Sequence, residues 1–349
     1  MISFYPGPSR VYDEVPGYVK KAHAKGILSM NHRSEDFMEL YREVVALLSM
    51  QLQVPKSYTV LFASSATECW EIIAQSLVEN QSAHFYNGAF GEKWFQYTQK
   101  LKPAALPVSF HLETSLPAQT VASADIICLT QNETSNGTQV DTALIAQVKK
   151  KNPHALVAVD ATSSMAGIML PFTLADVWFA SVQKCFGLPA GLAILILSPK
   201  AIERIAVRKE LAHYNSLAFM KQMADQWQTN CTPNVLGIYL LRCVLKQQPP
   251  IEETSKQTKE RHQAWADFFD ASKKLRLLVA NEAVRSHTVV TVTGDPAYLA
   301  KVKKHARKEG FLLGEGYGAL KSNTFRIANF PALQEREIKK LKKFLAHYL

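Results

Sequence analysis

The sequence lacks several features that would assign it to a specialised class. No apolar stretch is long enough to cross a membrane, and Met1–Arg10 has neither the basic nor the apolar region of a secretion signal. The five cysteines are Cys69, Cys128, Cys185, Cys231 and Cys243. They form no C-x-x-C pair and no spaced metal-binding set. We therefore expect reduced thiols, no bound metal, no membrane partner and a cytoplasmic location.

Acidic residues are too few to balance the basic ones, which leaves a formal net charge of +10. Much of the excess lies in 149–151, 301–308 and 336–343. The last two segments carry apolar residues at helical spacing, so their lysines belong to the solvated faces of amphipathic helices. No aromatic residues or docking motif accompany this charge, so we expect no nucleic-acid partner. The charge suits anionic small-molecule substrates instead.

Repeats and low-complexity tracts are also absent, and strand-like and helix-like segments alternate between residues 57 and 210. The expected strands are 58–63, 125–130, 155–160, 176–180, 192–197, 287–293 and 324–328. The expected helices are 67–77, 141–151, 233–247, 252–274, 297–308 and 333–348. This alternation predicts an α/β fold with a mainly parallel sheet covered on both faces.

The pattern changes after residue 228, which predicts a separate small α/β domain at the C-terminal end. We expect an N-terminal segment at 1–15, a large domain at 16–235 and a small domain at 236–349. The N-terminal segment contains Pro6, Gly7 and Pro8 and is predicted to be too irregular to join the sheet.

Lys184 lies between two apolar runs that both read as buried strands, with a glycine-containing turn directly after it. Dehydrating a lysine is costly unless its amine is used. One use is covalent attachment to an aldehyde cofactor, which needs a desolvated amine of lowered pKa. The alternative is an exposed lysine on an ordinary loop.

Asp160 ends another apolar strand, 24 residues before Lys184. Ligands of open α/β sheets bind beyond the carboxyl ends of the strands, and this spacing suits neighbouring strands joined by one crossover. A carboxylate at that position can hold a proton on a cofactor nitrogen. A helix cap or turn former is the alternative.

Four further segments offer binding groups. Ser64–Thr67 follows a strand and opens a helix, so free backbone N–H groups there can bind a phosphate. Thr134 follows the strand at 125–130, and Phe90 can stack on a heteroaromatic ring. Arg326 alternates with apolar residues on a strand and suits a carboxylate. The alternatives are an ordinary strand-to-helix turn for Ser64–Thr67, a polar loop for Thr134, a core aromatic for Phe90 and a surface arginine for Arg326.

In chain order these segments resemble the class V branch of the fold-type I pyridoxal-phosphate aminotransferases. The resemblance covers nearly the whole chain. Its motifs are Pro-Gly-Pro, Asn-His-Arg-Ser, Ser-Ser-Ala-Thr, Asn-Gly-x-Phe-Gly, Asn-Glu-Thr-x-x-Gly, Val-Asp-Ala-x-Ser-Ser, Gln-Lys-x-x-Gly, Thr-Pro and Phe-Arg-Ile. Each motif is weak alone, but together they imply a large domain with a seven-stranded-type sheet and a small C-terminal domain.

The resemblance implies a role for each matching residue. Lys184 carries the pyridoxal 5'-phosphate and moves the substrate proton, and Asp160 pairs with the pyridine nitrogen. The other implied cofactor contacts come from Ser65, Ala66, Thr67, Phe90, Thr134 and Gln183. Thr232 matches a residue that reaches the cofactor phosphate from a partner subunit, which implies a homodimer with shared sites. Arg326 is implied to bind the substrate α-carboxylate.

Within this family the sequence most resembles the phosphoserine aminotransferases, where a pair like His32-Arg33 helps to hold the substrate phosphate. Two departures stand out: a second His-Arg pair is missing before Arg326, where only Lys321 supplies a cation, and Cys231 replaces the asparagine before Thr-Pro. The run from Gly316 to Ile327 resembles alanine–glyoxylate and serine–pyruvate aminotransferases equally. A class V lyase such as a cysteine desulfurase, and a non-catalytic binding protein, are further alternatives.

Overall fold

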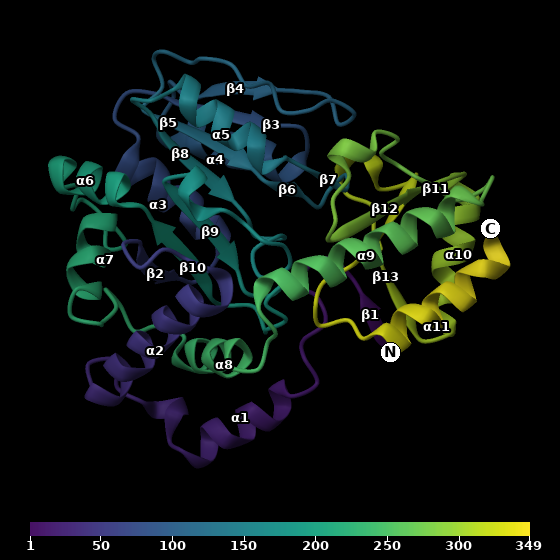
Figure 1. The fold of residues 1–349 in the computed structure, drawn as a ribbon, viewed down its shortest axis with the longest axis horizontal. Coiled ribbons are helices and arrows are strands. Elements are labelled where there is room, and N and C mark those ends of the chain that lie inside the picture. Colours follow the sequence, from purple (N-terminus) through teal and green to yellow (C-terminus); the bar gives the residue numbers. More distant parts are fainter.

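The computed structural model describes residues 1–349 as two α/β domains connected by α9 (Ile251–Asp270) (Figure 1). The large domain contains a seven-stranded sheet. Its strands, in spatial order, are β2 (Thr59–Ala63), β10 (Ala193–Leu197), β9 (Val177–Ser181), β8 (Leu156–Asp160), β5 (Ile126–Thr130), β3 (Ser82–Tyr86) and β4 (Leu106–Ser109). Only β10 runs antiparallel to its neighbours. The predicted fold, a mainly parallel sheet in an α/β protein, is confirmed.

Helices cover both faces of this sheet. Along β8, Val157 and Val159 point into one apolar core, while Leu156 and Ala158 point into the other. The first core includes α1 (Val15–Ala24), α2 (Glu35–Leu52), α5 (Thr142–Lys151) and α8 (Val235–Leu245). The second includes α3 (Ala66–Leu77), α4 (Ala89–Leu101), α6 (Pro199–Arg208) and α7 (Leu217–Ala224). Burial on both sides explains why the strands are almost purely apolar.

The small domain has a five-stranded sheet and its own core. The strand order is β1 (Ile2–Phe4), β13 (Phe311–Glu315), β14 (Thr324–Ala328), β12 (Val289–Thr293) and β11 (Arg276–Leu277). Side chains of α9, α10 (Pro296–Lys308) and α11 (Glu335–Leu345) pack into this core. Both chain ends lie on this domain (Figure 1).

The N-terminal segment was predicted to lie outside the sheet, and for the small sheet this is wrong. β1 pairs in parallel with β13, and Phe4 is fully buried in the small core. The prediction failed because three residues are too short a run to show a strand period.

The remaining elements are short. A two-stranded ribbon joins β6 (Asn132–Glu133) to β7 (Thr138–Gln139). Single 3₁₀ turns occur at Ile27–Ser29, Phe172–Leu174, Glu282–Val284, Gly318–Leu320 and Ala346–Tyr348. None of the helices combines the length and the apolar character needed to cross a membrane.

Helix α8 lies just after the domain boundary expected between residues 235 and 236, but it packs in the large domain. Ile238 and Leu241 of α8 are buried in the large core, and Ile251 at the start of α9 belongs to the same core. Trp265, further along α9, is buried in the small core. We therefore propose that the change of domain lies within α9.

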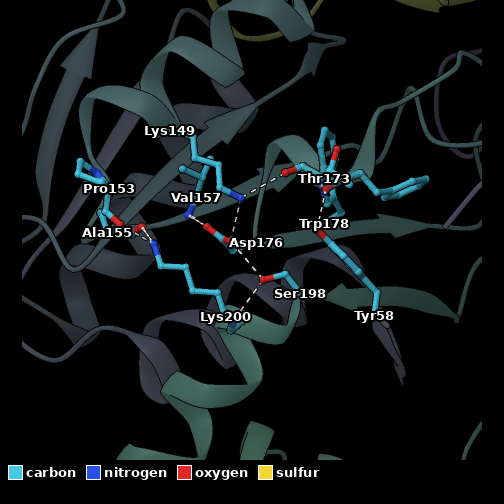
Figure 2. A network of polar contacts seen from close by, with 12 residues as sticks. Tyr58, Lys149, Pro153, Ala155, Val157, Thr173, Asp176, Trp178, Ser198 and Lys200 are labelled. Atoms are coloured by element: carbon cyan, nitrogen blue, oxygen red, sulfur yellow. Dashed lines mark hydrogen bonds and ion pairs between the residues drawn. The ribbon is translucent and has the colours of Figure 1, made fainter. Parts of the chain in front are cut away.

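The side chain of Asp176 connects the strands β8, β9 and β10 at the amino-terminal edge of β8 and β9 (Figure 2). The carboxylate is only 1% exposed and accepts hydrogen bonds from Lys149 Nζ at 3.0 Å, Ser198 Oγ at 3.1 Å and Val157 N–H at 2.9 Å. Val157 belongs to β8, and Ser198 directly follows β10. The network therefore fixes strands whose other ends carry the candidate site.

Candidate active site

A cavity of about 370 Å³ lies at the carboxyl ends of β5, β8 and β9, where the large domain meets residues of the small one. The predicted site residues that line it are Ala66, Thr67, Phe90, Thr134, Asp160, Gln183, Lys184 and Arg326. They come from elements far apart in the sequence, and the sheet brings them together because parallel strands end at one edge.

Lys184 follows β9 and extends into this cavity, where its Nζ lies 5.2 Å from the centre of the Phe90 ring. Burial lowers the pKa of the Lys184 amine, while the negative charges of Asp160 and Glu133 oppose that shift. A lowered pKa increases the fraction of the amine that is in its neutral, nucleophilic form. The exposed-loop alternative for Lys184 is therefore wrong.

The N-terminal segment packs directly over Lys184. Ser9 N–H donates to the Gln183 carbonyl at 3.0 Å, and Ser9 Oγ donates to the same carbonyl at 3.0 Å. A Cβ added to Gly7 would lie 3.0 Å from Lys184 Cε. The Pro-Gly-Pro motif is thus part of the cavity wall, and it restricts where the lysine can point.

Asp160 is 5% exposed and lines the cavity. Its Oδ2 accepts a hydrogen bond from Trp70 Nε1 at 3.1 Å, and its Oδ1 accepts one from Thr162 N–H at 2.9 Å. Burial raises the pKa of the carboxyl, while the hydrogen bond from Thr162 N–H and the positive charge of Lys184 lower it. No basic side chain forms an ion pair with Asp160. A buried carboxylate without a cationic partner is suited to a protonated ligand nitrogen.

The first turn of α3 provides an anion-binding group of the predicted kind. Ser65 is the N-cap, and its hydroxyl accepts from Glu68 N–H at 3.1 Å. Ala66 N–H donates to Ser181 Oγ at 2.7 Å, whereas Thr67 N–H has no partner. A free N–H at the positive end of a helix attracts a phosphate.

Phe90 lies on the first turn of α4 and is held there by Glu133. The buried Glu133 Oε2 accepts from the N–H groups of Phe90 and Gly91 at 3.0 and 3.1 Å. Its Oε1 accepts from Ser135 N–H at 2.9 Å. This carboxylate caps the helix and connects it to the loop that carries Thr134, which is 2% exposed.

Arg326 is 4% exposed and crosses from the small domain to that loop. Its Nη1 donates to the Thr134 carbonyl at 2.8 Å, and its Nε donates to the Glu315 carbonyl at 2.7 Å. It forms no ion pair with any carboxylate of the chain. A guanidinium that is fixed and lacks an acidic partner is well prepared to bind a carboxylate from a ligand.

Four predicted site residues do not line this cavity. Ser65 caps helix α3 and does not reach the cavity. His32, Arg33 and Thr232 lie elsewhere on the large domain. Arg33 Nη1 donates to Gln228 Oε1 at 2.6 Å. Arg33 and Thr232 therefore belong to one region of the surface, outside the cavity of their own chain.

Sequence reasoning missed several residues of the cavity wall, among them Trp70, Lys93, Ser181 and Tyr317. Helical spacing offered a signal for two of them, because Trp70 is three residues after Thr67 and Lys93 is three residues after Phe90. Lys321, the expected extra cation, is exposed and does not line the cavity.

Comparison with known proteins identifies the family. The model of the family "Aminotransferase class-V" matches residues 96–320. The chain belongs to the class V aminotransferases. It is therefore a pyridoxal-phosphate-dependent transaminase, which acts on small-molecule amino acids and 2-oxo acids.

Individual relatives match over almost the whole chain. A phosphoserine aminotransferase of Rhodococcus opacus (strain B4) is 27% identical, over 97% of this chain and 92% of its own length. The crystal structure of a phosphoserine aminotransferase from Cytophaga hutchinsonii is 34% identical, with a TM-score of 0.94 over 100% and 99% of the two chains. An alanine–glyoxylate aminotransferase from Nostoc sp. is 18% identical over 99% and 94%, and its TM-score of 0.81 shows a shared fold.

The cavity fits the cofactor of this family. Asp160 supplies a buried carboxylate without a cation, Lys184 an amine of lowered pKa, and Thr67 a free N–H. Gln183 Oε1 is buried without any hydrogen-bond partner in the same wall, as is Thr130 Oγ1. Unpartnered buried polar atoms in a cavity indicate a missing polar ligand.

Proposed function

We propose that the chain is a phosphoserine aminotransferase, which exchanges the amino group of phosphoserine with 2-oxoglutarate in serine biosynthesis. One observation carries this choice within the family: relatives of that name match from end to end, as a sequence and as a structure. The excess positive charge of the chain agrees with substrates that carry two negative groups.

We infer that each residue of the cavity has a separate task in the reaction. Arg326 orients the substrate by its α-carboxylate, and Asp160 holds the proton on the pyridine nitrogen of the cofactor. When bound, pyridoxal phosphate withdraws electrons from the substrate α-carbon and makes its proton acidic. Lys184 would take that proton at Nζ, and burial, which lowers the pKa of the amine, favours the neutral form that can accept it. The first turn of α3, with Gln183, anchors the phosphate.

We further propose a homodimer in which each cavity is completed by the partner subunit. Three residues with implied roles, His32, Arg33 and Thr232, are absent from the cavity of their own chain. Arg33 contacts Gln228, four residues before Thr232, so these residues share one surface. A two-fold axis next to this surface would deliver all three to the partner's cavity at once.

A half-reaction screen tests the substrate. The purified enzyme, loaded with pyridoxal phosphate, is mixed separately with phosphoserine, glutamate, alanine and serine, and conversion of the cofactor is followed by its absorbance. We expect conversion by phosphoserine and glutamate at much lower concentrations than by alanine or serine. Preferential conversion by alanine or serine would instead support the alanine–glyoxylate or serine–pyruvate type.

Lys184→Ala is the control for this screen. The variant should bind pyridoxal phosphate without covalent attachment and should convert none of the four amino acids, because the proton acceptor is gone. A wild-type protein that stays colourless with added cofactor would refute the proposal, and release of sulfide from cysteine would indicate a desulfurase.

A further inference from the structure

Lys93 lines the cavity, and its side chain has no role in the proposed reaction. It lies on α4, one turn after Phe90, and is half-buried. It forms no ion pair with any carboxylate of the chain; its Nζ donates instead to the Tyr317 hydroxyl and lies 4.9 Å from the centre of the Tyr317 ring. A half-buried ammonium that has only a phenol for a partner keeps donors free for an anionic ligand.

Tyr317 brings Lys93 and Arg326 together. The guanidinium carbon of Arg326 lies 5.5 Å from the centre of the same ring. The ring attracts both cations by cation–π interaction, and it therefore lowers the cost of placing two positive charges near each other. Lys93 comes from the large domain and Arg326 from the small one, and both side chains line the cavity.

The reactive lysine lies close to this pair. The centre of the Phe90 ring is 5.2 Å from Lys184 Nζ and 6.0 Å from Lys93 Nζ, and it is 4.9 Å from the Tyr317 ring centre. An amino acid whose α-carboxylate binds Arg326 and whose α-amino group reaches Lys184 therefore has Lys93 within range of its side chain. A side chain ending in an anion would gain a charge-assisted hydrogen bond there.

We propose that Lys93 is a specificity-determining residue, which binds the distal anion of the substrate: the phosphate of phosphoserine in one half-reaction and the side-chain carboxylate of glutamate in the other. This inference rests on the proposed function and deepens it. It assigns discrimination against uncharged side chains to a residue of the same chain, in addition to the partner's contribution.

Lys93→Met tests the inference, because methionine keeps an unbranched side chain and removes the charge. In the cofactor-loaded enzyme we expect KM and the dissociation constant of phosphoserine and glutamate to rise about tenfold or more. The corresponding values for alanine should change less than about twofold, since alanine has no distal anion. Lys93→Arg should recover most of the loss, because it restores the charge. Equal losses for all three amino acids, or no loss, would overturn the inference.

Lys100→Met is the matched control. Lys100 is on the same helix, is exposed and does not itself line the cavity, so its loss changes the net charge equally. Its Nζ lies 5.0 Å from the centre of the Tyr97 ring, at the edge of the cavity wall. Selective weakening of phosphoserine and glutamate by Lys100→Met would assign the effect to general electrostatic attraction and overturn the role of Lys93. A melting temperature like that of the wild type excludes misfolding as the cause.

The same measurements separate this inference from the proposed function. If the wild-type enzyme converts glutamate but not phosphoserine, the proposed function fails, and the effect of Lys93→Met on glutamate still decides the role of Lys93. If it converts only alanine or serine, no distal anion is recognised and both proposals are wrong.

Discussion

The indole Nε1 of Trp70 donates a hydrogen bond to Oδ2 of Asp160 across 3.1 Å, and both side chains are buried. Trp70 stands on the helix whose first turn provides the candidate phosphate site, whereas Asp160 ends a central strand. The bond therefore couples the position of the candidate phosphate-binding turn to that of the buried carboxylate in the cavity wall.

Replacing Trp70 with phenylalanine should weaken cofactor binding, because it removes a donor that favours the charged form of Asp160. A hydrogen bond to a charged group contributes about 1.5–3 kcal/mol, so we expect cofactor affinity to fall at least tenfold. Equilibrium dialysis against pyridoxal phosphate measures this. Trp94→Phe is the control, since Trp94 is equally buried and its Nε1 has no partner. Equal losses in both variants would show that only packing matters.

Subunit mixing checks the shared site. Lys184→Ala and Arg33→Ala homodimers should both turn over phosphoserine poorly. After subunit exchange, a mixed dimer contains one cavity with neither substitution, so activity should recover to roughly a quarter of the wild-type value. Activity that stays at the level of the separate variants would mean that Arg33 serves its own chain or no site at all.

Gly7→Ala should slow the reaction. The new methyl group would lie 3.0 Å from Lys184 Cε, and the flexible lysine would yield by moving its amine away from the substrate. Small displacements of a reacting group are costly, so we expect kcat to fall about tenfold. Gly17→Ala meets no atom within 4 Å and should leave kcat unchanged. An unchanged kcat in Gly7→Ala would contradict the role given to the N-terminal segment.

Asp176→Asn should lower stability and spare catalysis. It removes the charge that accepts bonds from Lys149, Val157 and Ser198 at the edge of the sheet opposite the cavity (Figure 2). We expect a loss of about 2 kcal/mol in the free energy of unfolding, measured with urea, because these three donors lose their charged acceptor. Asp225→Asn, which breaks the exposed pair with Lys221, should cost less than about 0.5 kcal/mol. A stability equal to that of the wild type would show that the network is dispensable.

Buried His84 should make the enzyme less stable in acid. Burial lowers the pKa of His84 from 6.5 to about 3 in the folded chain. Between these values the unfolded chain holds the proton and the folded chain does not, so the free energy of unfolding falls as the pH falls. His84→Phe should reduce this slope by up to about 1.4 kcal/mol per pH unit, measured by urea unfolding between pH 4 and 8. An unchanged slope in His84→Phe would contradict the effect.

Five of the seven strands of the large sheet and six of the eleven α-helices were predictable, because their residues carry strong local signals. The elements of the large domain that were not expected are β3, β4, α1, α2, α4, α6 and α7. Runs such as Leu156–Asp160 are apolar and short, and Asp141 caps the helix that was expected at 141–151. The sequence also placed Asp160 and Lys184 after strand ends, which is where a parallel sheet binds ligands. Short elements gave no such signal, and β1 was missed for that reason.

The sequence by itself determined the chemical groups: one lysine between buried strands, one aspartate at a strand end and one arginine on an apolar strand. Only the tertiary structure decided that Lys93 and Tyr317 join them, that Trp70 supports Asp160, and that Arg33 and Thr232 stay out of the cavity. The physical reason is that local patterns record burial and backbone preference. Contacts between distant segments depend on how the two domains pack, and a single sequence does not record that.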